Sequence, residues 1–117
     1  MRYLHRVGIA DDGKALKRLA TLTPAFVAAT RGPDGTIWLN EAGALEETPA
    51  FPIEAVDTLG AGDVFDGAFT LWLAEGGDVR EALRFAAAAA ALKCTRHGGG
   101  QAAPQRIEVE ELLLRAR

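Results

Sequence analysis

Two glycines set between two aspartates constrain the fold of this chain more than any other feature. The stretch DTLGAGDVFDGAF begins at Asp57, and its turn from Gly60 to Gly62 leads directly into an apolar segment. Glycine adopts backbone angles that are closed to other residues and leaves room for a ligand to approach closely. A helix that starts at such a turn directs its first N–H groups outward, with the positive end of the helix dipole behind them. The pattern therefore predicts a turn and a helix that can bind an anion.

Asp63 follows this turn directly, and its position has two interpretations. An acidic residue in the first turn of a helix commonly stabilises the helix dipole, and glycines before a helix can form no more than a tight turn. Alternatively, a carboxylate beside an anion site is placed to accept a proton from an attacking hydroxyl, as phosphoryl transfer requires. The short motif GAGD does not by itself decide between the two.

The composition excludes several classes of protein. A length of 117 residues suits one small domain or part of a larger one, and 49 % hydrophobic with 25 % charged residues excludes a disordered chain. The net charge of −3 argues against a nucleic-acid binder, and no stretch has the length of a membrane span or the pattern of a signal segment. Because Cys94 is the only cysteine, no internal disulfide can form, and we expect a cytoplasmic protein.

The N-terminal half predicts a helix followed by strands. Apolar residues recur at the helical period over residues 12–22, with an acidic pair at the start of the helix. The apolar run 25–30 predicts a buried strand, and residues 36–39 predict a second strand that pairs with it through a Pro-Asp-Gly turn. Pro49 and Pro52 restrict any strand near them to the edge of the sheet.

The C-terminal half predicts helices. Three are expected, over residues 64–74, 79–93 and 107–114. Gly76 and Gly77 end the first helix, and Asp78 with Glu81 has the pattern of a capping box for the second. Residues 96–104 form a loop. The exposed face of the last helix is expected to carry Glu108, Glu110 and Glu111.

These elements predict an α/β layer structure that is one end of a larger domain. A parallel sheet needs helices on both faces, and the sequence provides few crossover units. The two apolar helices also need a partner surface to cover them.

The whole stretch from Asp57 to Phe69 resembles the C-terminal signature D-T-x-G-A-G-D-x-F-x-G-A of the ribokinase-like, or PfkB, carbohydrate kinases. Upstream, ATRGPDG resembles the T-x-G-x-x-G strand and turn of that family, and downstream the segment 82–104 resembles its alanine-rich helix and following loop. The resemblance extends from about Ala15 to Leu114. It implies an α/β fold class, with residues 1–117 as a single C-terminal portion of the ribokinase-like three-layer α/β/α fold, lacking the N-terminal sugar-binding and lid region.

The same resemblance implies a carbohydrate kinase that transfers a phosphoryl group from ATP to a sugar hydroxyl. Asp63 would be the general base that deprotonates the hydroxyl. The N–H groups of Gly60, Ala61 and Gly62 would form the anion hole for the transferred phosphoryl group. The matched positions for the phosphates or ribose of the nucleotide are Thr30 and Gly32. Near its adenine, the matched positions are Ala87, or its neighbour Ala86, and Gly98.

Two metal ions are implied as well. Magnesium would accompany ATP, and a monovalent cation, usually potassium in this family, would steady the loop before the helix. The Asp57 side chain would hold the monovalent cation together with backbone carbonyls. The carbonyl positions implied are Leu59, Lys93, Arg96 and Gly98.

The N-terminal part of the family carries the sugar-binding residues, the lid strands and an N-x-x-E motif, and this sequence does not contain them. Its only asparagine, Asn40, has no glutamate three residues later. A second hypothesis is therefore a truncated, non-catalytic nucleotide-binding or interaction remnant that needs a partner chain. The expected partners are ATP and a small sugar, with a homodimer or a missing N-terminal part completing the site. Neither nucleic acid nor membrane is expected to bind. The identity of the sugar stays open.

Overall fold

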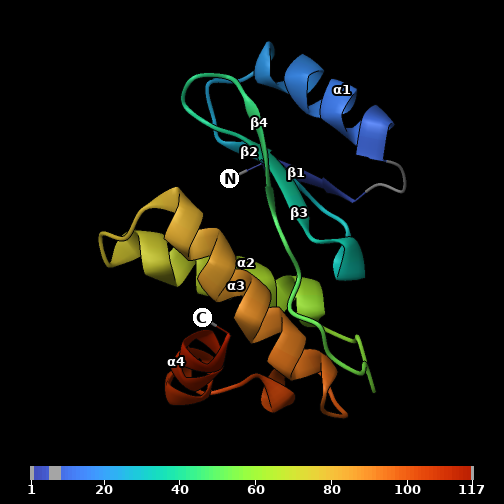
Figure 1. Ribbon diagram of the computed structural model, residues 1–117, viewed down its shortest axis with the longest axis vertical. Coiled ribbons are helices and arrows are strands. Elements are labelled where there is room, and N and C mark those ends of the chain that lie inside the picture. Colours follow the sequence, from blue (N-terminus) through green and yellow to red (C-terminus); the bar gives the residue numbers. More distant parts are fainter. Residues whose placement is uncertain (1, 6–8, 117) are drawn as a thin grey trace. The chain divides into compact units, whose positions relative to one another are not determined.

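The computed structural model describes residues 2–5 and 9–116 (Figure 1). The chain divides into two compact units, Met1–Pro49 and Ala50–Arg117, and each is described by itself. That residues 1–117 form a single portion of one domain stays a prediction. Among the described residues, no helix is both long and apolar enough to cross a membrane.

The first unit is a four-stranded sheet with one helix. In chain order it contains β1 (Arg2–His5), α1 (Ile9–Ala20), β2 (Val27–Thr30), β3 (Thr36–Leu39) and β4 (Leu45–Thr48). The strands lie in the order β1-β2-β3-β4; β1 runs parallel to β2, and the other two pairs are antiparallel. The predicted pairing of β2 with β3 is confirmed. Strand β4 was not itself predicted, but it lies at the edge of the sheet, as expected for any strand near Pro49.

Helix α1 packs against β2 and β3 through an apolar cluster. Leu16 of the helix is fully buried, and Leu19 packs against the same cluster. The strands contribute Val27, Ala29, Ile37 and Leu39. Alternate residues of a strand point to the same face, so these four side chains follow from the period-2 pattern of the sheet.

In this unit one expectation was wrong in detail, and one strand was missed entirely. The helix begins at Ile9 rather than at residue 12, because Asp11 and Asp12 lie within its first turn, where the helix dipole favours acidic residues, and not at its cap. Strand β1 was not predicted at all. It pairs Arg2 with Val27, far along the chain, and such non-local pairing leaves no signal in a four-residue segment.

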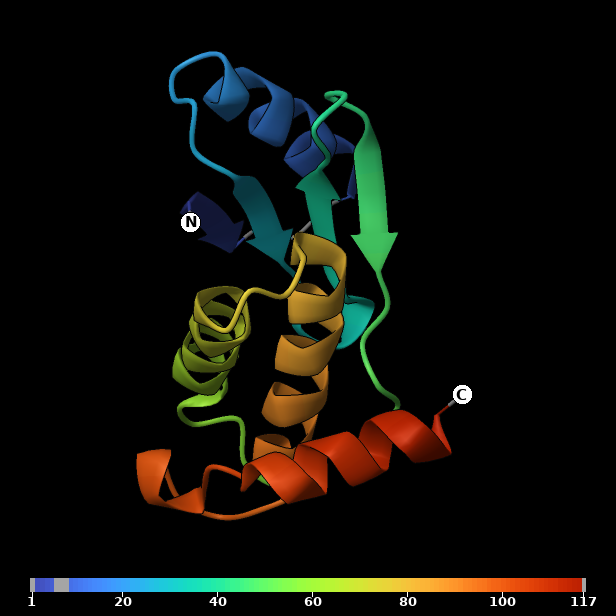
Figure 2. The same ribbon diagram turned by 90° about the vertical axis from the view of Figure 1, so that its left-hand side faces the viewer.

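The second unit consists of three helices. They are α2 (Ala61–Ala74), α3 (Val79–Cys94) and α4 (Arg106–Arg115), with a short 3₁₀ turn at Gly100–Ala102. Helices α2 and α3 pack along each other, and α4 lies across α3 (Figure 2). All three predicted helices are confirmed, and no helix end is shifted by more than three residues.

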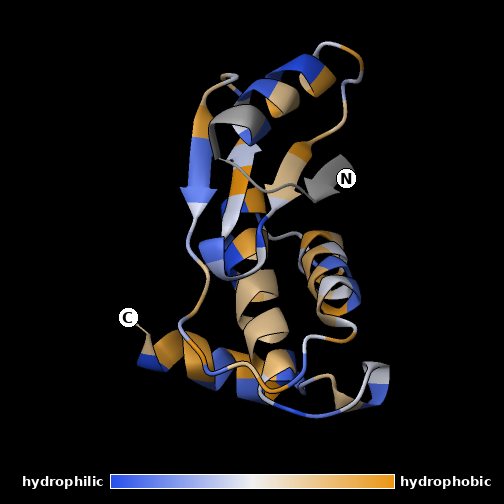
Figure 3. Ribbon diagram, turned by 90° about the vertical axis from the view of Figure 1, so that its right-hand side faces the viewer, coloured by the Kyte–Doolittle hydropathy of each residue, from blue (hydrophilic) through white to orange (hydrophobic). Residues whose placement is uncertain are grey.

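The core of this unit forms where the alanine-rich face of α3 meets its neighbours. Its central residues are Phe51, Phe85, Ala88, Ala89, Ala91 and Val109. The middle of α3 is almost uniformly apolar (Figure 3), and alanine side chains allow other helices to approach closely. Trp72 of α2 packs on Phe85 with ring centroids 4.7 Å apart, and the Arg106 guanidinium lies over both rings. Trp72 is half-buried in this core.

Local capping signals fix the helix ends. The Asp78 carboxylate accepts from the Glu81 N–H at 2.7 Å, which is one of the two hydrogen bonds of the predicted capping box. Gly76, with φ of +90°, follows α2, and the Gly77 N–H donates to the Trp72 carbonyl at 3.1 Å. Each of these hydrogen bonds satisfies a backbone N–H or carbonyl group that the end of a helix would leave without a partner.

Glu108 was expected on the exposed face of the last helix, but it is half-buried. It completes a capping box with Gln105 at the start of α4, accepting from the Gln105 N–H at 2.8 Å, and it also accepts from the Arg96 guanidinium. The hydrogen bond from Arg96 and that from the Gln105 backbone hold the pKa of Glu108 below its usual value of 4.5. Its role is to tie the loop after α3 to α4.

We predict that Gly77→Ala destabilises the chain. A Cβ atom at this position would lie 2.0 Å from Trp72 Nε1 and 2.2 Å from Cδ1, and the indole is held in place by Phe85 and Arg106. The expected loss in the free energy of unfolding is about 1–3 kcal/mol, measured by urea denaturation. Gly67→Ala is the matched control, since its Cβ would meet nothing within 4 Å. Within a helix this change should stabilise the chain by up to about 1 kcal/mol. A neutral Gly77→Ala would contradict the packing described here.

A second prediction concerns acid sensitivity. Because the pKa of Glu108 is lowered in the folded chain, its contribution to stability is present above its usual pKa of 4.5 and is lost as the pH falls through the folded-state value. Glu108→Gln should therefore flatten the decline of the free energy of unfolding below about pH 4.5. Glu111→Gln, on an exposed position of α4, is the control and should leave that slope unchanged. Equal slopes for Glu108→Gln and the wild-type chain would refute the prediction.

Candidate active site

The glycine turn opens helix α2 as the sequence predicted. Gly60 is the N-cap, with φ of +77° and ψ of 2°, in the left-handed region that glycine favours. The first helical hydrogen bond runs from the Val64 N–H to the Gly60 carbonyl at 3.0 Å, and the Ala61 N–H donates to the Thr58 carbonyl at 3.1 Å. The Gly62 N–H precedes the first intrahelical bond and lies at the positive end of the helix, where it can donate to an anion.

Asp63 lies in the first turn of α2, directly after these N–H groups. Its side chain is exposed, so its carboxylate is accessible to a substrate. The helix fixes it three residues after Gly60, next to the N–H groups at the start of α2. The dipole interpretation of Asp63 describes the same position and remains compatible with it.

Asp57 joins the turn before α2 to the loop after α3. One carboxylate oxygen accepts from the Leu59 N–H at 2.9 Å, and the other accepts from the Gly98 N–H at 3.0 Å. The hydrogen bond from Gly98 and then that from Leu59 lower the pKa of Asp57 from its usual 3.8, with smaller contributions from the charges of Lys93 and His97. The carboxylate is therefore held ionised as a bridge between two segments far apart in the sequence.

Lys93 makes a second bridge at the same place. Its residue exposure is 0 %, and its Nζ donates to the Asp57 carbonyl at 2.8 Å and to the Arg96 carbonyl at 3.1 Å. Sequence reasoning considered Lys93 only as a backbone carbonyl and missed the ammonium. A lysine in the last turn of a helix is a known signal for hydrogen bonds to nearby carbonyls, and it was available in the sequence.

Two glycines shape the loop after α3. Gly98 has φ of +107°, and a Cβ there would lie 2.8 Å from Gln101 Nε2. The backbone of Gly99 passes Gly60 so closely that a Cβ on Gly60 would contact it at 3.6 Å. Together with the Leu59–Asp57 hydrogen bond, these contacts bring six predicted positions together in the second unit. They are Asp57, Leu59, Gly60, Lys93, Arg96 and Gly98.

Thr30 and Gly32 belong to the first unit. Thr30 ends β2, and Gly32, with φ of +54°, begins the 3₁₀ turn Gly32–Asp34 before β3. The turn is closed by the Arg31 N–H, which donates to the Gly35 carbonyl at 2.8 Å. Gly32 is exposed and its surroundings are open, since a Cβ there would meet nothing within 4 Å. A ligand can therefore approach the backbone of this turn.

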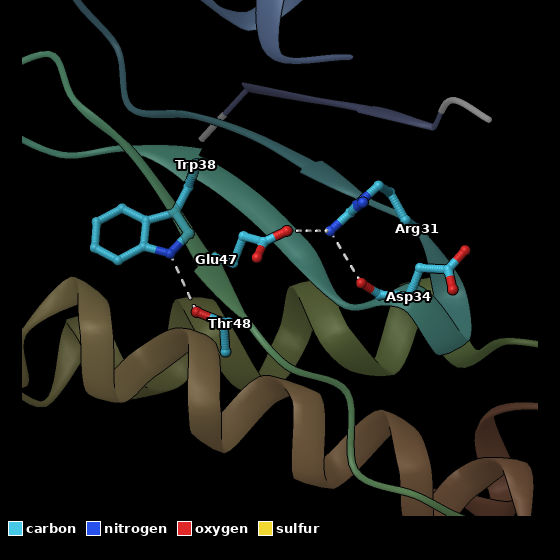
Figure 4. A network of polar contacts seen from close by, with 5 residues as sticks. All are labelled: Arg31, Asp34, Trp38, Glu47 and Thr48. Carbon is cyan, nitrogen blue, oxygen red and sulfur yellow. Dashed lines mark hydrogen bonds and ion pairs between the residues drawn. The ribbon is translucent and has the colours of Figure 1, made fainter. Parts of the chain in front are cut away.

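The Arg31 side chain braces this turn (Figure 4). Its Nη2 donates to the Asp34 carbonyl at 2.9 Å and to the Glu47 carboxylate on β4 at 3.3 Å. Among the described residues, its buried Nε and Nη1 atoms have no hydrogen-bond partner. On the same sheet, the Trp38 indole N–H donates to the Thr48 hydroxyl at 3.1 Å, which ties β3 to β4.

An apolar pocket of about 380 Å³ lies among α2, α3, α4 and the loop before α4. Its lining includes Asp63 together with the apolar residues Phe85, Ala89 and Val109. Ala87, predicted near the adenine, is half-buried and is not part of this lining. The pocket is therefore a different surface from the one on which the nucleotide base was predicted.

Metal-binding side chains are sparse. In the described ranges, 2–5 and 9–116, no three His, Cys, Asp or Glu side chains gather into a group that could hold a metal ion. A magnesium ion does not require such a group, because it binds through one or two carboxylates together with substrate phosphates and water.

The family model and the similar proteins all indicate the same family of carbohydrate kinases. Residues 5–106 match the model of the "pfkB family carbohydrate kinase". Ribokinase of Bacillus subtilis is 43 % identical over 110 residues, which cover 93 % of this chain and 37 % of that protein. A 2-dehydro-3-deoxygalactonokinase of Haloferax volcanii is 46 % identical over 91 residues, covering 74 % of this chain and 28 % of that protein.

Solved structures agree with the sequence matches. Ribokinase of Arabidopsis thaliana, solved with ribose and ATP, superposes with a TM-score of 0.85 at 28 % identity, covering 97 % of this chain and 41 % of that one. The predicted fold class, the C-terminal portion of a ribokinase-like fold, is thereby confirmed. The chain spans about a third of the length of the curated relatives it matches. With a family model that covers most of its residues, the chain belongs to the pfkB family of carbohydrate kinases.

Proposed function

We propose that this chain forms the ATP-binding and catalytic part of a kinase that phosphorylates a sugar hydroxyl. One observation carries the proposal. The Gly62 N–H precedes the first intrahelical bond of α2, and the exposed carboxylate of Asp63 follows it directly. This geometry supports an anion-binding turn and a base on one helix terminus, and family membership supports phosphoryl transfer to a carbohydrate.

In the proposed reaction, Asp63 accepts the proton of the sugar hydroxyl as that oxygen attacks the terminal phosphorus of ATP. The bond between this phosphorus and the bridging oxygen breaks, and ADP leaves with the electron pair. Negative charge on the transferred phosphoryl group is stabilised by the N–H groups of the Gly60–Gly62 turn and by the dipole of α2. Magnesium bound to the ATP phosphates would neutralise part of their charge.

Nucleotide contacts are proposed at both units. The open turn at Gly32, together with Thr30, would contact the phosphates or ribose. Ala87 on α3 and Gly98 in the following loop would lie near the adenine. Gly98 is suited to a position beside a ligand, because its φ of +107° and its tight approach to Gln101 exclude a side chain.

The sugar site would come from the part of the relatives that this chain does not span. We propose a small sugar or sugar acid as substrate, since ribokinases and dehydro-deoxysugar kinases are among the most similar relatives. An N-terminal part equivalent to theirs would complete the site.

The test uses a chimera. The N-terminal part of Bacillus subtilis ribokinase, up to the matched region, is joined to this chain, which is 43 % identical to the segment it replaces. The chimera should phosphorylate ribose with ATP. Asp63→Asn should lower kcat by about 10²–10⁴-fold, because the general base is lost, while the Kd for ATP changes little. Coupled-enzyme kinetics and calorimetry measure the two quantities.

Glu111→Gln is the control for removal of an exposed carboxylate, and it should leave kcat unchanged. Normal turnover by the Asp63→Asn chimera would disprove the assignment of the base. A chimera that folds and binds ATP but transfers no phosphoryl group would support the alternative, a non-catalytic nucleotide-binding remnant.

A further inference from the structure

The Lys93 ammonium contacts one of the oxygens that were predicted to hold potassium. Its Nζ donates to the Arg96 carbonyl, one of the predicted ligands, and to the carbonyl of Asp57. The residue is 0 % exposed, so this positive charge is enclosed by the protein. Main-chain carbonyls that point at a buried cation are the same arrangement by which proteins replace the hydration shell of potassium.

Two of the other predicted ligands, the Asp57 carboxylate and the Lys93 carbonyl, already accept hydrogen bonds. Both carboxylate oxygens of Asp57 accept from backbone N–H groups, of Leu59 and of Gly98. The Lys93 carbonyl accepts from the Arg96 N–H at 3.0 Å. A free cation placed among these oxygens would also lie against a buried charge of the same sign, and like charges in such a setting repel strongly. The residues present therefore do not fit a free monovalent cation.

We propose that the Lys93 ammonium takes the place of the monovalent cation, so that this chain neither binds nor needs potassium. The tethered charge links the segment before the glycine turn to the loop after α3. An ion bound from solution would make the same link, but only at sufficient concentration. The proposal concerns cation binding and stability, so it stands or fails separately from the proposed kinase function.

The first experiment measures thermal unfolding of the wild-type chain in KCl, NaCl and choline chloride at equal ionic strength. The unfolding midpoint should be the same in the three salts. A saturable rise of the midpoint with potassium alone would overturn the proposal.

The second experiment removes the charge with Lys93→Met, which keeps an apolar side chain of similar length. In choline chloride its midpoint should fall by on the order of 10 °C, because the carbonyls lose their donor. Potassium should restore part of this loss in a saturable way, since the oxygens become available. A variant that folds but shows no response to potassium would contradict replacement of a cation. Lys17→Met, at an exposed position of α1, is the matched control and should show no potassium-specific change.

If Lys93→Met folds in none of the salts, thallium(I) decides the matter on the wild-type chain. Thallium(I) substitutes for potassium and is detected by its NMR signal or by anomalous scattering from crystals. The proposal expects no saturable binding and no thallium peak at the Arg96 carbonyl. A peak at that position would overturn it.

Discussion

The geometry of the glycine turn depends on the hydrogen bonds that the buried Lys93 ammonium donates to two backbone carbonyls. Burying a charge costs several kcal/mol unless hydrogen bonds compensate it, so the carbonyls of Asp57 and Arg96 must stay where the ammonium can reach them. The Asp57 carboxylate adds a second bridge to Gly98. Two segments far apart in the sequence are thereby fixed to each other, and the start of α2 is fixed with them.

This arrangement gives the turn a chemical consequence. An anion site works best when its donors are positioned before the charge develops, because no free energy is then spent on reorganisation. The left-handed Gly60, the close approach of Gly99 and the Lys93 bridges all hold the same few residues. Asp63 gains a defined place relative to the N–H groups because both belong to one helical turn.

Local features of the fold were predictable from the sequence, and non-local ones were not. The glycines around α2, the Asp78 cap and the hairpin turn each depend on a few neighbouring residues. Strand β1 and the Arg96–Glu108 pair join residues that no short-range pattern connects, although Gln105 and Glu108 do have the spacing of a capping box. At the site, the short motif alone did not decide whether Asp63 stabilises the helix dipole or acts as a base. The family resemblance supplied its role, which remains a proposal.

The most direct test of the account is an NMR titration of the ¹⁵N-labelled chain with magnesium–ATP, followed through its backbone amides. The account predicts a saturable change that is largest at the N–H groups of Gly62 and Asp63. A smaller change is expected at Ala61, whose N–H already donates to the Thr58 carbonyl. Saturable changes elsewhere in the chain, with none between Asp57 and Asp63, would contradict the central claim that this turn binds the phosphates.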